Sequence, residues 1–248
     1  KLGIKTGVHV HPLRRGKRDN FSAPAQVLEL LEEYIEIRES DILPNRMRKV
    51  IPTKYTDAFV QQYMKDPDSV DKDKKEQFEM LLKQVGIDLE YQFFVKEYQG
   101  QDDLFGVVID RDYNTHTVMQ LNEIRKQCIE KGYHFFITTP CFEFWLLLHL
   151  VDVKKQYKGD MQKFRDNEKR TNKHTFTSLQ VSEYAGHSKK ISEKIFRQYY
   201  LNHIDYAISQ VKKFFSTDVE KLIGTDETED SKKGKLGSNL PELFKLLR

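Results

Sequence analysis

Two apolar runs near the middle of the chain have the length and composition of buried β-strands. They cover residues 104–110 and 133–139, and both are rich in β-branched and aromatic side chains. Between them, apolar side chains recur at helical spacing, at Val118, Leu121, Ile124 and Cys128. Thr117 and Gln120 have the spacing of a capping box, and Gly132 is placed to end the helix. With an apolar helix at 141–150 after Pro140, the pattern predicts a right-handed βαβ unit followed by a helix.

The pattern before this centre predicts further elements of both kinds. Residues 7–11 and 91–95 are strand candidates, and Ser22 and Pro24 begin a helix that continues to about Arg38. The stretch from 40 to 88 is charged and interrupted by prolines. We therefore expect helical pieces there, inserted into the sheet.

After Val151 the strand signals disappear. Residues 155–215 have helical spacing, residues 225–235 predict a polar, mobile loop, and Ser238 or Asn239 is placed to cap a last helix ending near Leu247. We predict an α/β fold with a core at 1–150, a helical insertion at about 40–88 and a helical C-terminal half at 151–248.

Composition and charge leave several functions open. The 248 residues include 41 Lys and Arg against 38 Asp and Glu, a net charge of +3 that neither supports nor excludes nucleic-acid binding. The distribution is more informative, because the first eighteen residues carry no carboxylate and a second basic region at 163–197 is interleaved with aromatic side chains. Such regions hold phosphates and stack bases, or form an ordinary solvated helix face. The candidate phosphate contacts are Arg14, Arg15, Lys17, Arg18, Lys189, Lys190 and Lys194.

The two cysteines, Cys128 and Cys141, are typical of a reducing cytosol rather than of a disulfide-bonded secreted protein. Neither belongs to a Cys-x-x-Cys pair, which argues against structural zinc. The longest apolar run, 142–151, is too short to cross a membrane. We expect a cytoplasmic protein without a membrane anchor, able to form oligomers.

Candidate chemistry gathers where the two central strands end. The first run ends in Asp110-Arg111-Asp112, and Glu143 lies in the first turn of the helix after the second run. Reactive groups in open α/β sheets collect at the carboxyl ends of strands, and adjacent carboxylates repel unless a cation neutralises them. The three carboxylates therefore predict a site for Mg²⁺ or Mn²⁺. Arg111 is placed to orient a phosphate or to pair with Glu143.

Each of these residues also has a structural interpretation. Asp110 or Asp112 is placed to cap the helix that starts near Thr115, and Glu143 is favourable at a helix N-terminus whatever the function. Cys141 also lies at a helix N-terminus, but no His–Asp pair accompanies it, so a buried structural thiol is the preferred interpretation. His149 fits a core position. His9 and His11 alternate in a strand and are candidates for metal or phosphate contacts.

The two segments that carry these residues resemble one family. Val-Val-Ile-Asp-Arg-Asp at 107–112, and Thr-Pro-Cys-Phe-Glu-Phe-Trp-Leu-Leu-Leu-His at 139–149, are similar to the D-x-D strand and the N-P-C-F-E-x-W-L-L-L-H segment of the RloB family. Gly-Ser-Asn-Leu-Pro at 237–241 resembles that family's C-terminal pattern, and Thr139 replaces the commoner asparagine. The resemblance implies a Toprim-like, Rossmannoid, mainly parallel sheet with flanking helices.

The resemblance also implies a function. RloB proteins are encoded beside RloA-type ATPases in restriction and abortive-infection loci, and they resemble Toprim-like metal-dependent nucleases. It implies that Asp110 and Asp112 hold Mg²⁺, that Glu143 is a third ligand or supports the ligands, and that DNA or RNA is hydrolysed. Family members open with a strand ending in a C-E-G-E-x-T-E-like turn that carries an acid–base glutamate. This sequence begins beyond that turn, so we expect the first family strand to lie outside it.

Two rival functions differ in class. A catalytically inert subunit that binds nucleic acid or a partner under the control of an ATPase accounts for the same residues. A phosphotransferase of the haloacid-dehalogenase type would use the first Asp of D-x-D as a nucleophile. That class has the pattern D-x-D-x-T on its first strand, whereas Asn114 holds the last position here.

Overall fold

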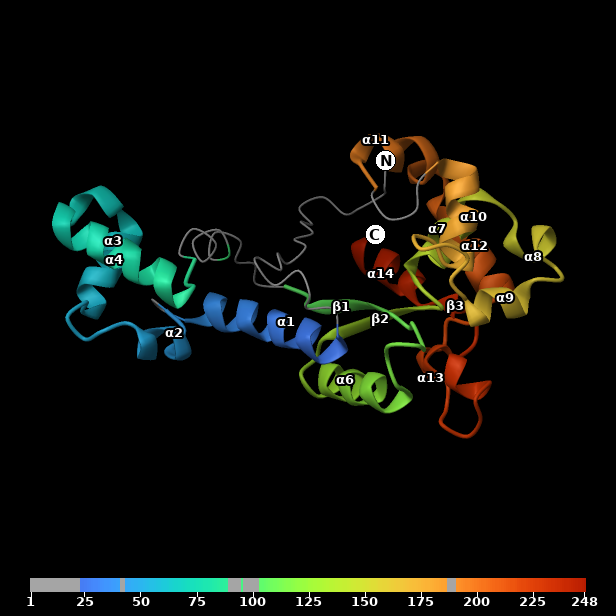
Figure 1. Cartoon of the computed structure of the whole chain (residues 1–248), viewed down its shortest axis with the longest axis horizontal. Helices are drawn as coiled ribbons and strands as arrows, with labels where there is room; N and C mark the ends of the chain where they lie inside the picture. Colours follow the sequence, from blue (N-terminus) through green and yellow to red (C-terminus); the bar gives the residue numbers. More distant parts are fainter. Residues whose placement is uncertain (1–22, 41–42, 89–94, 96–102, 187–190) are drawn as a thin grey trace. The chain divides into compact units, whose positions relative to one another are not determined.

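The computed structural model of the chain describes residues 23–40, 43–88, 95, 103–186 and 191–248 (Figure 1). They divide into two compact units, a smaller one within 28–104 and a larger one that contains 105–248. The strand predicted at 7–11 lies outside the described residues. The same is true of the strand predicted at 91–95, except for Val95, which is helical.

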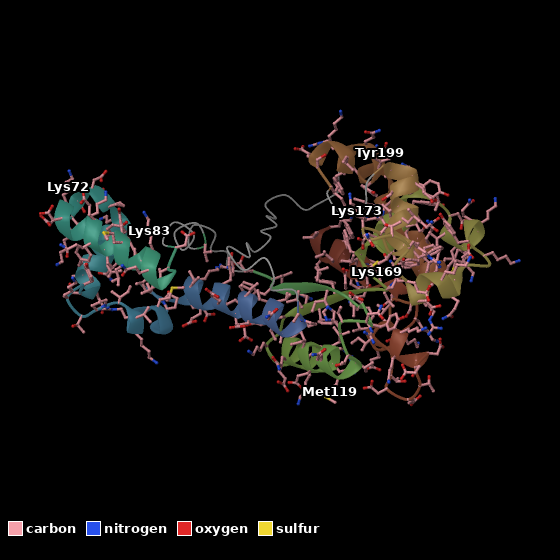
Figure 2. All side chains as sticks on the ribbon, in the orientation of Figure 1. Lys72, Lys83, Met119, Lys169, Lys173 and Tyr199 are labelled. Carbon is pink, nitrogen blue, oxygen red and sulfur yellow. The ribbon has the colours of Figure 1, made fainter. Side chains whose placement is uncertain are left out.

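The smaller unit is helical, as the sequence predicts for residues 40–88. Its elements are α1 (Pro24–Glu39, which begins in the larger unit), α2 (Asn45–Val50), α3 (Asp57–Lys65), the 3₁₀ turn η1 (Pro67–Ser69) and α4 (Lys72–Val85). The Thr56 and Asp71 side chains accept hydrogen bonds from backbone amides in the first turns of α3 and α4, which fixes where these helices begin. Lysines such as Lys72 and Lys83 project from α4 (Figure 2).

A three-stranded sheet forms the centre of the larger unit. β1 (Gly106–Asp110) pairs in parallel with β2 (His134–Thr139), and β3 (Gly237–Ser238) pairs antiparallel with β2 on its other edge. The helix α6 (Val118–Glu130) connects β1 to β2, and its capping box is formed as predicted. The βαβ unit expected from the sequence is therefore present, within a mixed rather than wholly parallel sheet.

The third strand was not predicted, because two residues are too short to give a periodic signal. Its pairing with β2 is continued by the side chain of Asn239. The Asn239 Oδ1 accepts a hydrogen bond from the Ile137 amide at 2.6 Å, and its Nδ2 donates to the Phe135 carbonyl at 2.8 Å. Asn239 is the N-cap residue of the last helix, but its side chain bonds to β2 and not to that helix.

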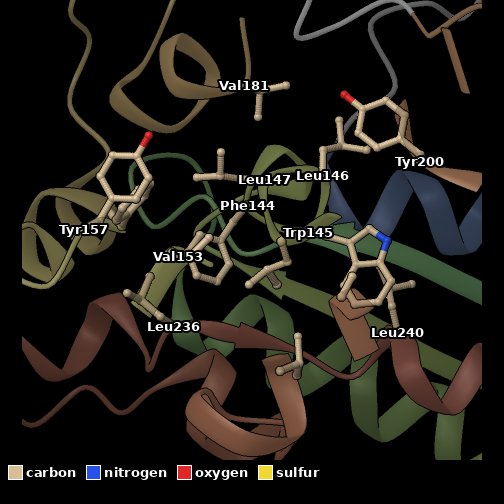
Figure 3. Packing of buried hydrophobic residues seen from close by; sticks show 14 of the residues in the cluster. Phe144, Trp145, Leu146, Leu147, Val153, Tyr157, Val181, Tyr200, Leu236 and Leu240 are labelled. Atoms are coloured by element: carbon tan, nitrogen blue, oxygen red, sulfur yellow. The ribbon is translucent and has the colours of Figure 1, made fainter. Parts of the chain in front are cut away.

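The C-terminal helices share one core with the sheet. They are α7 (Phe142–Leu150), α8 (Val153–Gln156), α9 (Met161–Asp166), α10 (Phe176–Ala185), α11 (Glu193–Tyr199), η2 (Leu201–His203), α12 (Ile204–Phe214), α13 (Val219–Ile223), η3 (Ser231–Lys233) and α14 (Leu240–Leu247). Phe136 on β2 and Phe144 on α7 lie in the same apolar cluster as Val211 on α12 and Leu240 on α14. Figure 3 shows Phe144 and Leu240 in this packing. The boundary that we placed between residues 150 and 151 therefore falls inside a single core. Among the described residues, no helix combines the length and apolar character needed to cross a membrane.

Candidate functional site

A pocket of about 600 Å³ opens where β1 and β2 end. Its lining comes from three segments: the turn after β1, the start of α7 and the connection between α9 and α10. The lining residues are Asp110, Asp112, Tyr113, Asn114, Thr115, Cys141, Glu143, Asp166, Asn167, Glu168, Lys169 and Thr175. The structure thus brings the three predicted carboxylates, Asp110, Asp112 and Glu143, to one cavity.

Asp110 is the last residue of β1 and is held by the first turn of α7. Its Oδ1 accepts a hydrogen bond of 2.8 Å from the Phe142 amide, which favours the ionised carboxylate. Burial acts in the opposite direction and is the largest effect, followed by the negative charge of Glu143 and, more weakly, that of Asp112. Together they raise the pKa of Asp110 to about 7. A carboxyl group with this environment is stabilised by any cation that enters the pocket.

The turn after β1 keeps the alternation of a strand for two more residues. The amide of Arg111 donates to the Thr138 carbonyl at 2.9 Å, and the amide of Asp112 donates to the Pro140 carbonyl at 2.9 Å. Successive side chains therefore still point to opposite sides, so Asp110 and Asp112 share the pocket side. Asp112 has a φ of 25°, in the left-handed region that aspartate tolerates better than most residues, and there the chain leaves the sheet.

Arg111 points the other way, which corrects our prediction that it contacts a phosphate or pairs with Glu143. Its side chain is 1% exposed. The guanidinium donates from Nε to the Ile223 carbonyl at 2.6 Å, from Nη1 to the His116 carbonyl at 2.6 Å, and from Nη2 to the Lys232 carbonyl. Burial lowers the pKa of Arg111 to about 10, so it remains charged at neutral pH. Arg111 ties the end of β1 to Ile223, just before the 225–235 loop, and to Lys232 within that loop.

That loop is anchored in the structure. Arg165 on α9 donates to the Gly234 carbonyl at 3.1 Å and to the Asp230 carbonyl at 2.8 Å, and Lys233 forms an ion pair with Asp166 at the pocket wall. The polar composition of residues 225–235 predicted a mobile loop. In the structure the loop is instead held by contacts from two distant arginines, Arg111 after β1 and Arg165 on α9.

Glu143 and Cys141 form the side of the pocket that belongs to α7. Cys141 is the N-cap residue of α7, and Glu143 lies in its first turn, as predicted. Burial, the negative charges of Glu143 and Asp110 and a hydrogen bond to Glu143 all raise the pKa of the Cys141 thiol well above its ordinary value. A thiol that stays protonated is a poor nucleophile, in agreement with the structural interpretation of this cysteine.

The wall opposite the strand ends was not predicted from the sequence. Asn167 ends α9 in the left-handed conformation, with a φ of 40°. Its Nδ2 lies 3.5 Å from the Cys141 sulfur, and its Oδ1 accepts from the Thr177 amide at 3.0 Å. One asparagine thus joins this wall to α7. The sequence gives only one indication of its role, which is that asparagine is common at helix ends in the left-handed conformation.

The other predicted residues lie outside this pocket or outside the described residues. His9, His11, Arg14, Arg15, Lys17, Arg18, Lys189 and Lys190 are not among the residues that the structure describes. Lys194 is exposed on α11 and does not line the pocket. His149 is buried on α7, where burial lowers its pKa to about 4 and its Nδ1 lies 2.8 Å from the Trp145 carbonyl oxygen, so it is a neutral core residue.

The described residues contain no group of three or more His, Cys, Asp or Glu side chains already arranged around a metal position. The composition of the pocket is nevertheless compatible with a hard cation. It offers carboxylate oxygens, which Mg²⁺ and Mn²⁺ prefer, and Mg²⁺ keeps several waters while using one or two protein carboxylates. None of Asp110, Asp112 and Glu143 forms an ion pair with a Lys or Arg within the part of the chain that is described.

Comparison with known proteins identifies the family. The family model described as "RloB-like protein" matches residues 19–246, nearly the whole chain, so the chain belongs to the RloB-like family. No curated protein and no solved structure matches it.

Proposed function

We propose that this RloB-like protein is the divalent-cation-dependent nuclease subunit of an antiphage defence system, of the abortive-infection type, with a Toprim-like site that hydrolyses phosphodiester bonds of DNA or RNA. One observation carries the proposal. Asp110, Asp112 and Glu143, from two neighbouring strand ends, line one open pocket, and no described Lys or Arg neutralises them through an ion pair.

In this proposal Asp110 and Asp112 bind Mg²⁺ or Mn²⁺, and Glu143 is a third ligand or holds a metal-bound water. Such a cation supplies Lewis-acid polarisation of a phosphoryl oxygen. The protein contributes the positions of the ligands: the Phe142 amide orients Asp110, and the backbone bond from Asp112 to Pro140 holds the second carboxylate on the same side.

The electrostatics of the pocket support this assignment. Burial and two nearby carboxylates make the ionised form of Asp110 unfavourable in the protein alone. A divalent cation reverses that balance, because it favours the charged forms of all three groups at once. The defence role, and the regulation of the site by an RloA-type ATPase, rest on the family resemblance.

The test is cleavage of labelled DNA and RNA by the purified protein, alone and with its ATPase, in Mg²⁺, in Mn²⁺ and in EDTA. We expect cleavage only with a divalent cation. We expect Asp112→Asn to reduce it by at least about 10–100-fold, the loss that follows even when a residue that only supports the metal ligands is replaced. Glu130→Gln, which removes an exposed carboxylate on α6, is the matched control and should leave cleavage unchanged.

A catalytically inert binding subunit is the second candidate. It is favoured by the lack of a preassembled three-residue ligand group among the described residues. Nucleic-acid binding with no cleavage in any metal, with the ATPase present, would establish this candidate and reject the nuclease.

A further inference from the structure

Among the described residues that line it, the pocket carries one lysine on an otherwise acidic wall. The lining includes five acidic residues, Asp110, Asp112, Glu143, Asp166 and Glu168, and the lysine is Lys169. Asp166 is neutralised by Lys233, but the three carboxylates at the strand ends are not paired in this way within the described part of the chain. Such a pocket repels a phosphate backbone unless cations beside it compensate.

Lys169 belongs to a small hairpin that the sequence did not reveal. Residues 168–175 fold back on themselves: Lys169 and Thr175 form an antiparallel bridge, and the Phe176 amide donates to the Glu168 carbonyl at 2.8 Å. We call these residues the 168–175 hairpin. Its turn is held by the Arg170 amide, which donates to the His174 carbonyl at 2.8 Å, and by the Thr171 hydroxyl, which accepts from the amides of Lys173 and His174.

The hairpin is fixed relative to the carboxylates. Asn167, directly before it, bonds to Cys141 at the start of α7 and to the Thr177 amide in α10. Arg170 lies over the Phe176 ring at 5.4 Å, and its guanidinium is 4.0 Å from Glu168. These contacts fix the backbone of the hairpin relative to the start of α7. A hairpin side chain therefore has a defined position relative to Asp110 and Glu143, as substrate positioning requires.

Two lysines on the hairpin are available for a ligand. Lys169 and Lys173, which are labelled in Figure 2, are exposed. Neither has an ion pair with any carboxylate that the structure describes. Lys194, by contrast, lies on a helix that does not line the pocket.

We propose that the 168–175 hairpin binds the sugar–phosphate backbone of the nucleic acid beside the carboxylate pocket, with Lys169 contacting the phosphate nearest the carboxylates and Lys173 a neighbouring one. The inference rests on the proposed function for its choice of nucleic acid as the ligand. It adds which residues hold the backbone. These residues read no sequence, because phosphate contacts position a nucleic acid without distinguishing its bases.

The experiment measures binding in EDTA, so that it does not depend on cleavage. Fluorescence anisotropy of short single-stranded DNA and RNA is recorded at several salt concentrations for the wild-type chain, for the double variant Lys169→Gln/Lys173→Gln and for Lys126→Gln. Lys126, on α6, is exposed and outside the pocket, and the thermal midpoint of each variant confirms that it is folded.

We expect the slope of log K against log salt to become shallower by about 0.7 for each phosphate that a lysine no longer neutralises, hence by about 1.4 in the double variant, and to stay unchanged in Lys126→Gln. A preference of the wild type for RNA or DNA identifies which backbone is used. Unchanged affinity and slope in a folded double variant, or no binding of either strand by the wild type, overturns the inference. Binding that depends on the hairpin without metal-dependent cleavage rejects only the nuclease. Metal-dependent cleavage, together with a salt slope that is the same in the wild type and the double variant, rejects only the role of the hairpin in binding the backbone.

Discussion

The two compact units of this chain have cores of different composition. The core of the smaller unit is apolar and aromatic, built from Tyr55, Phe59, Tyr63 and Phe78 with ring centroids 4.7–6.4 Å apart. The larger unit also has an apolar core. In addition it contains every buried polar or charged side chain that the structure describes, including Arg111, Thr138, Gln210, Ser238 and Asn239.

The difference shows where the fold has to be specific. An aromatic cluster is stabilised by burial and tolerates many arrangements. Buried polar groups are costly unless each has its partners, so they specify one arrangement. In the larger unit Arg111 and Thr138 lie at the ends of β1 and β2, whereas Gln210 bonds to the carbonyls of Leu148 and Val151 at the end of α7. Part of the specific polar packing of this chain thus lies beside its candidate site.

The largest expected effect comes from a substitution in the core of the smaller unit, which should leave the larger unit unchanged. Phe78 is 0% exposed, so Phe78→Ala should destabilise the smaller unit by about 3–5 kcal/mol, because it removes a buried ring and leaves a cavity. The chain's one tryptophan, Trp145, lies in the larger unit. We therefore expect part of the helical circular-dichroism signal to be lost at a lower urea concentration than in the wild type. The midpoint of the tryptophan-fluorescence transition should stay unchanged. Equal shifts of both signals would show that the two cores do not unfold separately.

The next effect removes the central polar side chain of the larger unit. Arg111→Ala leaves three backbone carbonyls without their donor, and we expect a loss of about 2–4 kcal/mol in the fluorescence transition. The 225–235 loop should also become sensitive to proteolysis.

Arg125 is the matched control for Arg111. It is also an arginine that reaches α13, through an exposed pair with Glu220 at 3.1 Å, and Arg125→Ala should cost less than about 1 kcal/mol. Similar losses in the two variants would mean that Arg111 is an ordinary surface arginine in solution.

The smallest effect concerns pH and also belongs to the larger unit. The pKa of Asp110 is about 7 in the folded protein, against 3.8 ordinarily, so between these values the folded state holds a proton that the unfolded chain releases. In EDTA, stability should therefore fall as pH rises from about 4 to 7 and then level off, by at most about 4 kcal/mol in all.

Asp110→Asn should remove this dependence, and Glu130→Gln should not. The measurement is the urea midpoint of tryptophan fluorescence across that pH range. A wild type whose midpoint changes with pH just as the Asn variant's does would show that Asp110 has an ordinary pKa.

Much of the central architecture was predictable because it is local. The strands β1 and β2 and the helix between them follow from periodicity, and Val118, Leu121, Ile124 and Cys128 are buried as expected. Thr117 and Gln120 marked the start of that helix correctly, because a capping box involves only four consecutive positions. The gathering of Asp110, Asp112 and Glu143 in one pocket follows from the parallel pairing of two neighbouring strands.

What escaped prediction depends on contacts between distant residues. We expected Arg111 to contact a phosphate or Glu143, but the bond from the Arg111 amide to Thr138 continues the alternation of the strand and turns Arg111 inward. The partners of its guanidinium lie as far away as Lys232, and no local pattern encodes them. The 168–175 hairpin has a similar origin: its turn depends on Thr171, and its position depends on Asn167 reaching Cys141.

The side chain of Asn239 has a further consequence for the part of β2 that β3 does not pair with. A carboxamide carries the same donor and acceptor as a peptide group, so Asn239 acts as one more peptide unit of β3. It pairs with the buried Ile137 amide and Phe135 carbonyl, two polar groups of β2 that the two-residue β3 does not reach. A two-residue strand followed by one asparagine thus leaves neither of these groups without a hydrogen bond inside the protein.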